Sequence, residues 1–264
     1  MSYINTLQLT PILLEQQTAE HPSESEIHEF SLTSDYEGLP IKIRQIIAPN
    51  TNRVIIYAHG SFDHMDGHWG FYTKILIYLA QKKIASSVQL TTARQPTYNE
   101  QDLFSITSAF QGKTFAQELE DVGKVIDHTL NHLDELVEDP ETAEIIFIGL
   151  SLGGTLMTLQ AATHPRVNKL MLISSGCRTQ NGALPMMDTY PIAEHIKEAA
   201  AQFKGKMLHV SPLADGVVPI NFQNELFDAF TRAKKKRTLV PGADHILSYE
   251  KPLLSKKILA FAKD

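Results

Sequence analysis

The chain has 264 residues, of which 43% are hydrophobic and 20% charged, a composition ordinary for a soluble globular protein with a full core. Thirty acidic side chains against 24 basic ones leave a formal net charge of −6. Because a net negative charge does not attract the phosphate backbone of nucleic acid, we expect no nucleic-acid partner. The single cysteine, Cys177, excludes an intramolecular disulfide, and its small and apolar neighbours indicate a buried thiol.

The first residues lack a basic region followed by an apolar core, and no apolar run reaches the roughly 18 residues of a membrane span. We therefore expect a cytoplasmic protein that does not associate with membranes. Residues 1–27 are polar and acidic and predict a loose N-terminal arm. Residues 28–264 are expected to form a single domain.

After the arm, two short strand patterns at 28–34 and 40–48 flank a run of turn residues, which predicts an antiparallel hairpin. Short unbroken apolar runs then alternate with amphipathic helix patterns. Runs that are apolar on both faces are typical of a parallel sheet covered by helices on both sides. The strands expected from these runs are 54–58, 84–90, 145–148, 170–173, 207–210 and 238–240.

Between the strands, apolar residues recur every three or four positions, as on one face of a helix. The longest such stripe runs from Phe115 to Val137, and shorter helices are expected near 152–163 and 189–203. The fold class is therefore α/β, with a mostly parallel, doubly wound sheet of about eight strands and an N-terminal antiparallel hairpin. The basic run at 234–237 is expected to be a solvated helix terminus before the last strand, where cations suit the helix dipole.

The sharpest local signal lies at 149–154, which reads GLSLGG between a strand pattern and a helix pattern. A strand that turns abruptly into a helix needs small residues two positions either side of the serine, and the serine oxygen is then held exposed above the sheet. We expect Ser151 to be a nucleophile. The alternative is a glycine-rich turn with an incidental serine.

A serine hydroxyl needs a base that takes its proton and a third group that orients the base. His245 lies in a loop after the last predicted strand, and loops at the carboxyl ends of parallel strands border the ligand crevice. Asp215 follows an earlier strand at the same edge and is the expected acid. Asp244 is adjacent to His245 and badly placed to align with its ring, and Asp188 falls in an irregular segment.

A tetrahedral intermediate also needs donors aimed at its oxyanion. The amide of Leu152, directly after the serine, is one candidate. The second is expected from the turn after the first parallel strand, which begins His59-Gly60. The Ser61 amide is preferred there and Phe62 is the alternative, although His-Gly is also an ordinary tight turn.

The His-Gly turn, the GLSLGG elbow and the order serine, aspartate, histidine together resemble the α/β-hydrolase superfamily. The elbow and the ending GADH at 242–245 look most like small carboxylesterases and the cinnamoyl-esterase and dienelactone-hydrolase-like groups. Many relatives carry the pattern DxRGxGxS after the strand that corresponds to 84–90. Here the chain reads TTARQPT at 91–97, so the nearest subgroup stays open.

The resemblance implies a lid between the strand ending near Ser174 and the next strand, but residues 176–205 leave room for a minimal one. We expect a shallow pocket bordered by Phe62, Met186 and Met187. The stretch 91–113 is the other possible border, with Tyr98, Phe104 and Phe110 as lining residues. A surface loop with packed aromatics is an equal alternative for that stretch.

These features predict a serine esterase that cleaves a small-molecule carboxylic ester of short or compact acyl groups through an acyl-serine intermediate. It would need neither an organic cofactor nor a metal. The alternatives left open are a thioesterase or peptidase of the same fold, a non-hydrolytic enzyme that uses the same three residues, and a non-catalytic binding protein.

Overall fold

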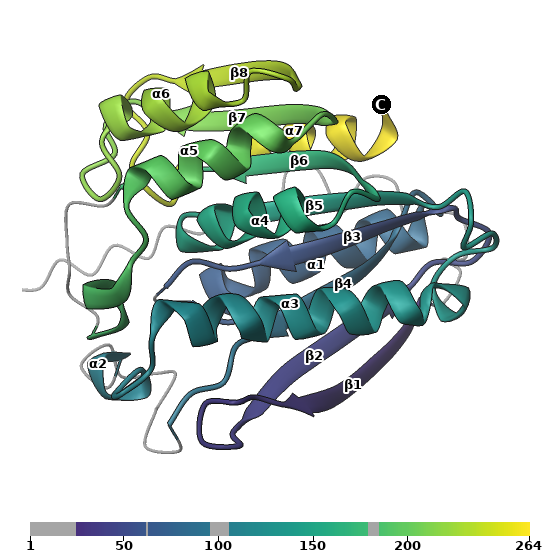
Figure 1. The fold of residues 1–264 in the computed structure, drawn as a ribbon. Helices are drawn as coiled ribbons and strands as arrows, with labels where there is room; N and C mark the ends of the chain where they lie inside the picture. Colours follow the sequence, from purple (N-terminus) through teal and green to yellow (C-terminus); the bar gives the residue numbers. More distant parts are fainter. Residues whose placement is uncertain (1–24, 62, 96–105, 179–184) are drawn as a thin grey trace, which may run out of the picture.

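The computed structural model describes residues 25–61, 63–95, 106–178 and 185–264. Their centre is an eight-stranded sheet with the strand order β1-β2-β4-β3-β5-β6-β7-β8 (Figure 1). The strands are β1 (Glu26–Thr33), β2 (Pro40–Ile47), β3 (Arg53–Ala58), β4 (Ser86–Thr91), β5 (Glu144–Leu150), β6 (Val167–Ile173), β7 (Lys206–Pro212) and β8 (Lys234–Val240).

The first two strands form the expected hairpin, in which β1 and β2 pair antiparallel and β2 pairs antiparallel with β4. From β4 to β8 every neighbouring pair is parallel. The carboxyl ends of these six strands therefore meet at one edge of the sheet, where ligand crevices form in such folds. The predicted fold class is confirmed: the sheet has eight strands and is mostly parallel, and its first two strands form an antiparallel hairpin.

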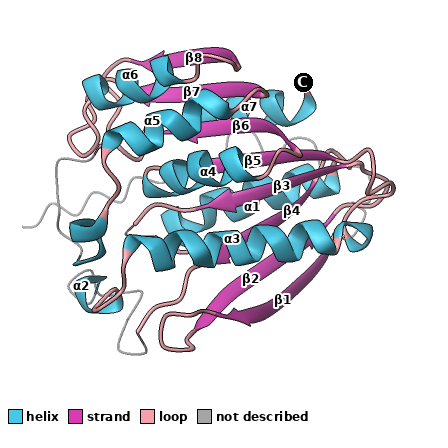
Figure 2. Cartoon of the chain, in the orientation of Figure 1, coloured by secondary structure: helices cyan, strands magenta, loops and turns pink. Residues whose placement is uncertain are grey.

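Strands and helices alternate along most of the chain, and the helices cover both faces of the sheet (Figure 2). Figure 1 shows α3, α4, α5 and α6 in front of the sheet and α1 and α7 behind it. The helices are α1 (Gly67–Gln81), α2 (Ile106–Ala109), α3 (Phe115–Asn131), α4 (Leu152–Thr163), α5 (Ala193–Gln202), α6 (Ile220–Ala229) and α7 (Lys251–Lys263). In the described part of the chain, no helix has the length and apolar content to cross a bilayer.

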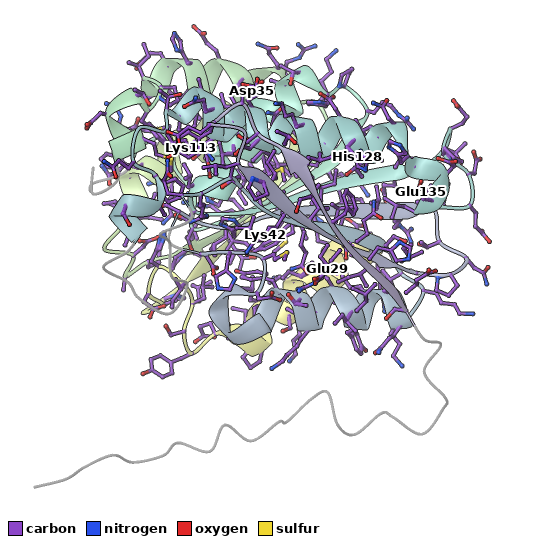
Figure 3. The ribbon with its side chains drawn as sticks, turned by 90° about the horizontal axis from the view of Figure 1, so that it is seen from below. Glu29, Asp35, Lys42, Lys113, His128 and Glu135 are labelled. Carbon is purple, nitrogen blue, oxygen red and sulfur yellow. The ribbon has the colours of Figure 1, made fainter. Side chains whose placement is uncertain are left out.

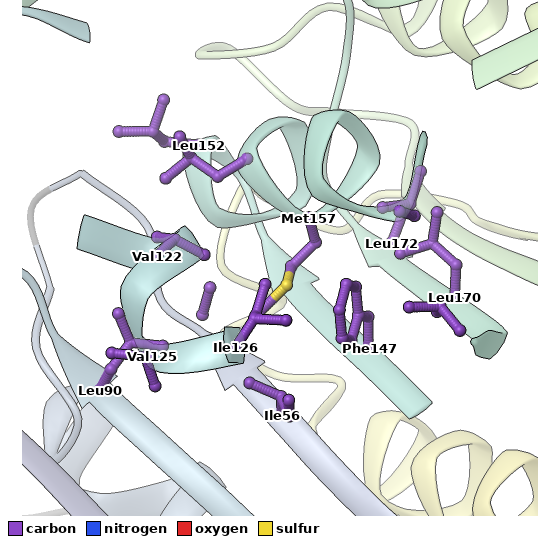
Figure 4. Packing of buried hydrophobic residues seen from close by; sticks show 14 of the residues in the cluster. Ile56, Leu90, Val122, Val125, Ile126, Phe147, Leu152, Met157, Leu170 and Leu172 are labelled. Carbon is purple, nitrogen blue, oxygen red and sulfur yellow. The ribbon is translucent and has the colours of Figure 1, made fainter. Parts of the chain in front are cut away.

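The sheet divides the buried apolar residues into two clusters, one under each helical layer. Figure 4 shows Met157 of α4 reaching toward Ile126 of α3 and Phe147 of β5. These side chains have less than 1% of their surface exposed, and burial of the whole apolar cluster to which they belong helps to hold α3 and α4 on the sheet. The Cys177 thiol is buried as expected, and burial with the nearby Glu225 raises its pKa to about 11.

Several element boundaries differ from the sequence-based expectations, as where the helix expected to reach Val137 ends at Asn131, and two further differences change an assignment. The basic run at 234–237 was predicted to end a helix, but it lies inside β8. Lysine and arginine on an edge strand discourage pairing with another chain, and this placement gives the charges a role that periodicity does not reveal. The strand β1 also begins at Glu26, so two residues assigned to the arm belong to the sheet, while residues 1–24 lie outside the described part.

Two fully or nearly buried histidines make stability depend on pH. His209 on β7 is fully buried, and burial together with the nearby Arg237 lowers its pKa to about 3. Burial and the nearby Arg94 likewise lower the pKa of His59 to about 3. Both imidazoles stay neutral in the folded protein under mildly acidic conditions, whereas the unfolded chain takes up protons near pH 6.5.

We predict that acid destabilises the parent protein more than it destabilises the His209→Leu variant. Between pH 7 and pH 5 only the unfolded state protonates at this position, so the free energy of unfolding should fall by about 2 kcal/mol for His209 alone. Urea unfolding at the two pH values should show that His209→Leu loses about 2 kcal/mol less than the parent. His195→Leu, which removes an exposed histidine, is the control, and equal losses in parent and His209→Leu would contradict the prediction.

Candidate active site

The turn between β5 and α4 holds Ser151 in a left-handed backbone conformation, with φ of 53° and ψ of −119°. This region is costly for a residue with a side chain, and such outliers gather at functional sites. The Ser151 amide donates to the Ile173 carbonyl on β6 at 2.8 Å. The main chain is therefore anchored to the neighbouring strand while the side chain stands at the carboxyl edge of the sheet.

Three glycines make this turn sterically possible. A Cβ on Gly149 would lie 2.5 Å from the Gly153 carbonyl oxygen, and a Cβ on Gly153 would lie 2.3 Å from the Ala58 carbonyl oxygen. At Gly154 a Cβ would come 1.9 Å from the hydroxyl oxygen of Ser175. The three glycines of GLSLGG are thus required by close approach within the elbow and between the elbow and the ends of β3 and β6.

The structure brings Ser151, His245 and Asp215 together at this edge. The His245 Nε2 atom lies 2.9 Å from the Ser151 Oγ, and the His245 Nδ1 atom lies 2.9 and 3.0 Å from the two carboxylate oxygens of Asp215. A carboxylate only accepts hydrogen bonds, so Nδ1 carries the proton and Nε2 presents a lone pair to the serine hydroxyl. The arrangement can take a proton from Ser151.

The Asp215 carboxylate is fully enclosed and well supplied with donors. The amides of Val217 and Val218 donate to its Oδ1 at 2.9 and 2.8 Å, and the side-chain amide of Gln223 donates to Oδ2 at 3.2 Å. Sequence reasoning missed Gln223, a buried residue in the first turn of α6. A glutamine in a helix carries no motif, and its contact depends on how α6 packs against the loop.

The loops that carry His245 and Asp215 are hydrogen-bonded to each other, since the Ala214 amide donates to the Ala243 carbonyl at 3.0 Å. Asp244 instead accepts from the amide and hydroxyl of Ser248. Asp188 is exposed in the short 3₁₀ helix η3 (Pro185–Thr189). Of the three aspartates weighed from the sequence, Asp215 is the one that contacts His245.

The turn after β3 packs against the elbow, as the oxyanion prediction requires. A Cβ on Gly60 would lie 3.4 Å from the Ser151 Cβ, so the main chain passes directly beside the serine. Leu152 is the first residue of α4, and amides in the first turn have no acceptor within their helix. Ser61 is half-buried next to Gly60, whereas Phe62 lies outside the described residues. The donor roles of Ser61 and Leu152 stay predictions.

The predicted pocket residues are only partly described. Met186 is fully buried and belongs to the core cluster under α3 and α4. The backbone of Met187 lies in η3, but its side chain is outside the described part, as are Tyr98 and Phe104. Phe110 is fully buried and stacks under Arg94, so it packs inside the protein. Met186 as a pocket wall stays a prediction.

No group of three or more histidine, cysteine, aspartate or glutamate side chains converges on a common point within the described ranges. His245 and Asp215 are instead held by each other and by main-chain donors.

No protein-family model and no curated protein matches the chain in sequence. Solved structures do match in fold over nearly its whole length. Est1E from Butyrivibrio proteoclasticus aligns with a TM-score of 0.63 and 14% identity over 88% of this chain and 96% of its own. The esterase Pf2001 from Pyrococcus furiosus aligns with a TM-score of 0.64 and 11% identity over 90% of both chains.

A dienelactone hydrolase from Anabaena variabilis aligns with a TM-score of 0.57 and 12% identity over 89% of this chain and 98% of its own. One structure of Est1E has ferulic acid bound. At these identities the similarity establishes the architecture alone. The chain has the α/β-hydrolase fold, as its strand order, its helical layers and its elbow indicate.

We predict that Gly153→Ala destabilises the fold, although alanine is the better helix former by about 1 kcal/mol. The added Cβ would overlap the carbonyl oxygens of Ala58 and His59 at 2.3 and 2.4 Å, and overpacking typically costs about 1–3 kcal/mol. Urea unfolding measures the difference. Gly216→Ala is the matched control, because its Cβ meets no atom within 4 Å; a Gly153→Ala protein as stable as the parent would refute the close-approach argument.

Proposed function

We propose that this protein is a serine hydrolase in which Ser151 is the nucleophile, His245 the general base and Asp215 the group that orients the histidine. The observation that carries the proposal is the continuous hydrogen-bonded chain from Asp215 through His245 to Ser151, at an elbow with φ of 53°. Each contact lies within 3.0 Å, inside the reach that proton transfer needs.

The proposed reaction has two halves. The Ser151 oxygen attacks the ester carbonyl carbon while its proton passes to His245 Nε2, and the carbonyl oxygen becomes an oxyanion facing the amides of Leu152 and Ser61. The carbon–oxygen bond to the alcohol then breaks, and His245 returns the proton to the leaving oxygen. Water attacks the acyl-serine by the same route, which releases the acid and restores Ser151. Asp215 keeps its negative charge throughout and stabilises the imidazolium.

A carboxylic ester with a short or compact acyl group is the proposed substrate. Two of the structures that share this fold are named as an esterase and as a dienelactone hydrolase, which supports ester chemistry without fixing the acid or the alcohol. The segment between β6 and β7 supports a minimal lid. Its described part holds only η3 and α5, and α5 packs on the sheet beside α4 and α6.

We predict that Ser151→Ala abolishes hydrolysis of p-nitrophenyl acetate and labelling by a fluorophosphonate probe, while the protein stays folded. Loss of one member of such a set commonly lowers kcat by about 10⁴- to 10⁶-fold. His245→Ala should be about as damaging, and Asp215→Asn somewhat less so, because the aspartate orients the ring without bonding to substrate.

Asp244→Asn and Asp188→Asn are the matched controls, since neither carboxylate contacts His245 in the structure. Both should keep the parent kcat. If Ser151→Ala retained more than about a tenth of the parent rate, the assignment of the nucleophile would be wrong. A folded parent protein that is neither labelled nor active on esters, thioesters or peptides would favour the non-catalytic alternative.

We predict a preference for short acyl chains. A long chain gains about 0.8 kcal/mol per methylene only where apolar surface closes around it, and a minimal lid provides little such surface. The measurement is kcat/KM across p-nitrophenyl esters from about two to sixteen carbons. A maximum at twelve carbons or longer, or a jump in rate above the micelle concentration, would show that a substantial apolar cover exists.

A further inference from the structure

Lys113, Glu118 and Asp121 form a buried ion cluster at the amino-terminal end of α3, and each has at most 2% of its surface exposed. The Lys113 ammonium donates to Glu118 at 2.6 Å and to Asp121 at 2.7 Å. Figure 3 shows Lys113 near one end of α3 and His128 near the other. None of the three residues contacts Ser151, His245 or Asp215 through a hydrogen bond or ion pair that the structure records.

The ion cluster holds the chain where it leaves β4. Lys113 donates to the Ala93 carbonyl at 2.8 Å, and Asp121 accepts from the Ala93 amide at 2.9 Å. Glu118 accepts from the Thr92 hydroxyl at 2.8 Å. Both main-chain groups of Ala93 are therefore bound by charged side chains, which fixes the direction in which the next residue leaves the strand.

That next residue is Arg94, which is buried with 8% of its surface exposed. Its guanidinium lies over the ring of Phe110 at 4.5 Å and donates to the Asp63 carbonyl at 2.8 Å. The same Nη2 atom lies 3.5 Å from the His59 Nε2 atom. Arg94 therefore contacts both ends of the turn at 59–63.

His59 is suited to this contact as a neutral ring. Its Nδ1 lies 2.6 Å from the Gly60 carbonyl, to which it donates, so Nε2 presents its lone pair toward Arg94. Burial and the charge of Arg94 lower the pKa of His59 to about 3, so the ring does not repel the guanidinium. The turn it belongs to passes beside Ser151 and carries the proposed oxyanion donor Ser61.

Buried ion clusters are seldom the most stable way to fill a core, because desolvation offsets much of the attraction between the charges. A cluster that binds both main-chain groups of Ala93 achieves something that apolar side chains do not, since it fixes the position of a loop. Burial alone would raise the pKa of Glu118, but Lys113 and Arg94 lower it below its ordinary value. The cluster and Arg94 are thus coupled through charge as well as through the chain.

We propose that Arg94 is a positioning residue for the turn after β3, which carries the proposed oxyanion donor Ser61. Arg94 is itself held in place by the buried ion cluster of Lys113, Glu118 and Asp121. The inference rests on the serine hydrolase function proposed above. Arg94 holds the turn that begins at His59-Gly60, so that the Ser61 amide faces the oxyanion formed when Ser151 attacks the substrate. Because that donor acts in the transition state, displacing it lowers kcat more than it raises KM.

The test compares Arg94→Met with Arg53→Met in the full chain. Methionine keeps apolar contact with Phe110 but donates no hydrogen bond. Arg53 is the matched control, because it pairs with Glu144 at 2.8 Å at the opposite end of β3. With p-nitrophenyl acetate, Arg94→Met should lower kcat by about 10- to 100-fold and leave KM within about threefold. Arg53→Met should keep both constants.

Inhibition by an aryl trifluoromethyl ketone distinguishes positioning from a general structural role. Such a ketone forms a tetrahedral oxyanion on a catalytic serine, so its inhibition constant should rise in Arg94→Met by about the same factor as kcat falls. A merely structural role would lower the unfolding midpoint without this parallel loss. Should Arg94→Met be isolated unfolded, Arg94→Lys, which keeps the charge but not the forked donor, carries the same expectations with a smaller factor.

The outcomes separate the two proposals. An inactive parent, or a fully active Ser151→Ala variant, would overturn the proposed function. A parent whose activity depends on Ser151, together with a folded Arg94 variant that keeps kcat and inhibitor affinity within about twofold, would overturn the role of Arg94 alone. A rise in KM with unchanged kcat would also contradict it, because it would place Arg94 in ground-state binding.

Discussion

The left-handed backbone of Ser151 is the constraint on which the rest of the site depends. Its φ of 53° places the hydroxyl above the sheet, and it is possible only where β5, β3 and α4 approach more closely than side chains allow. Gly149 and Gly153 meet that demand, because a Cβ at either position would overlap neighbouring main chain. The close approach also brings the turn after β3 beside the serine, so one steric requirement positions both the proposed nucleophile and the proposed oxyanion donor.

Around this elbow, polar groups are placed by loops that brace one another. Main-chain amides hold Asp215, which in turn holds His245, and charged groups hold Ala93 and, through Arg94, the turn at 59–63. Asp215 is bound both by amides of its own loop and by groups of other segments, and Ala93 is bound by side chains from the region of α3, so the buried polar groups are satisfied. The carboxyl edge of the sheet is therefore braced by polar contacts as well as by apolar packing, and a preorganised site requires such support.

Much of the fold could be predicted from the sequence, because the physics involved is local. Runs such as 145–148 are apolar on both faces and indicated parallel strands, and the turn residues at 34–38 indicated the hairpin. The basic run at 234–237 was assigned wrongly, since four charged residues carry no strand signal. Its strand character comes from pairing with β7, a contact that no local pattern records.

For the site, the sequence by itself determined the elbow, since the close approaches that demand Gly149, Gly153 and Gly154 occur within a few residues of Ser151 or at the adjacent strand ends. It also predicted His245 as the base and Asp215 as the acid, because both follow strands at the same edge of the sheet. Only the tertiary structure decided that His245 meets Ser151 across 94 positions of sequence and that Asp215 rather than Asp244 meets His245. The contact of Gln223 with Asp215 and the contacts of the cluster around Lys113 were likewise visible only in the tertiary structure. Hydrogen bonds between distant segments depend on packing, and packing of this kind leaves no periodic pattern in the sequence.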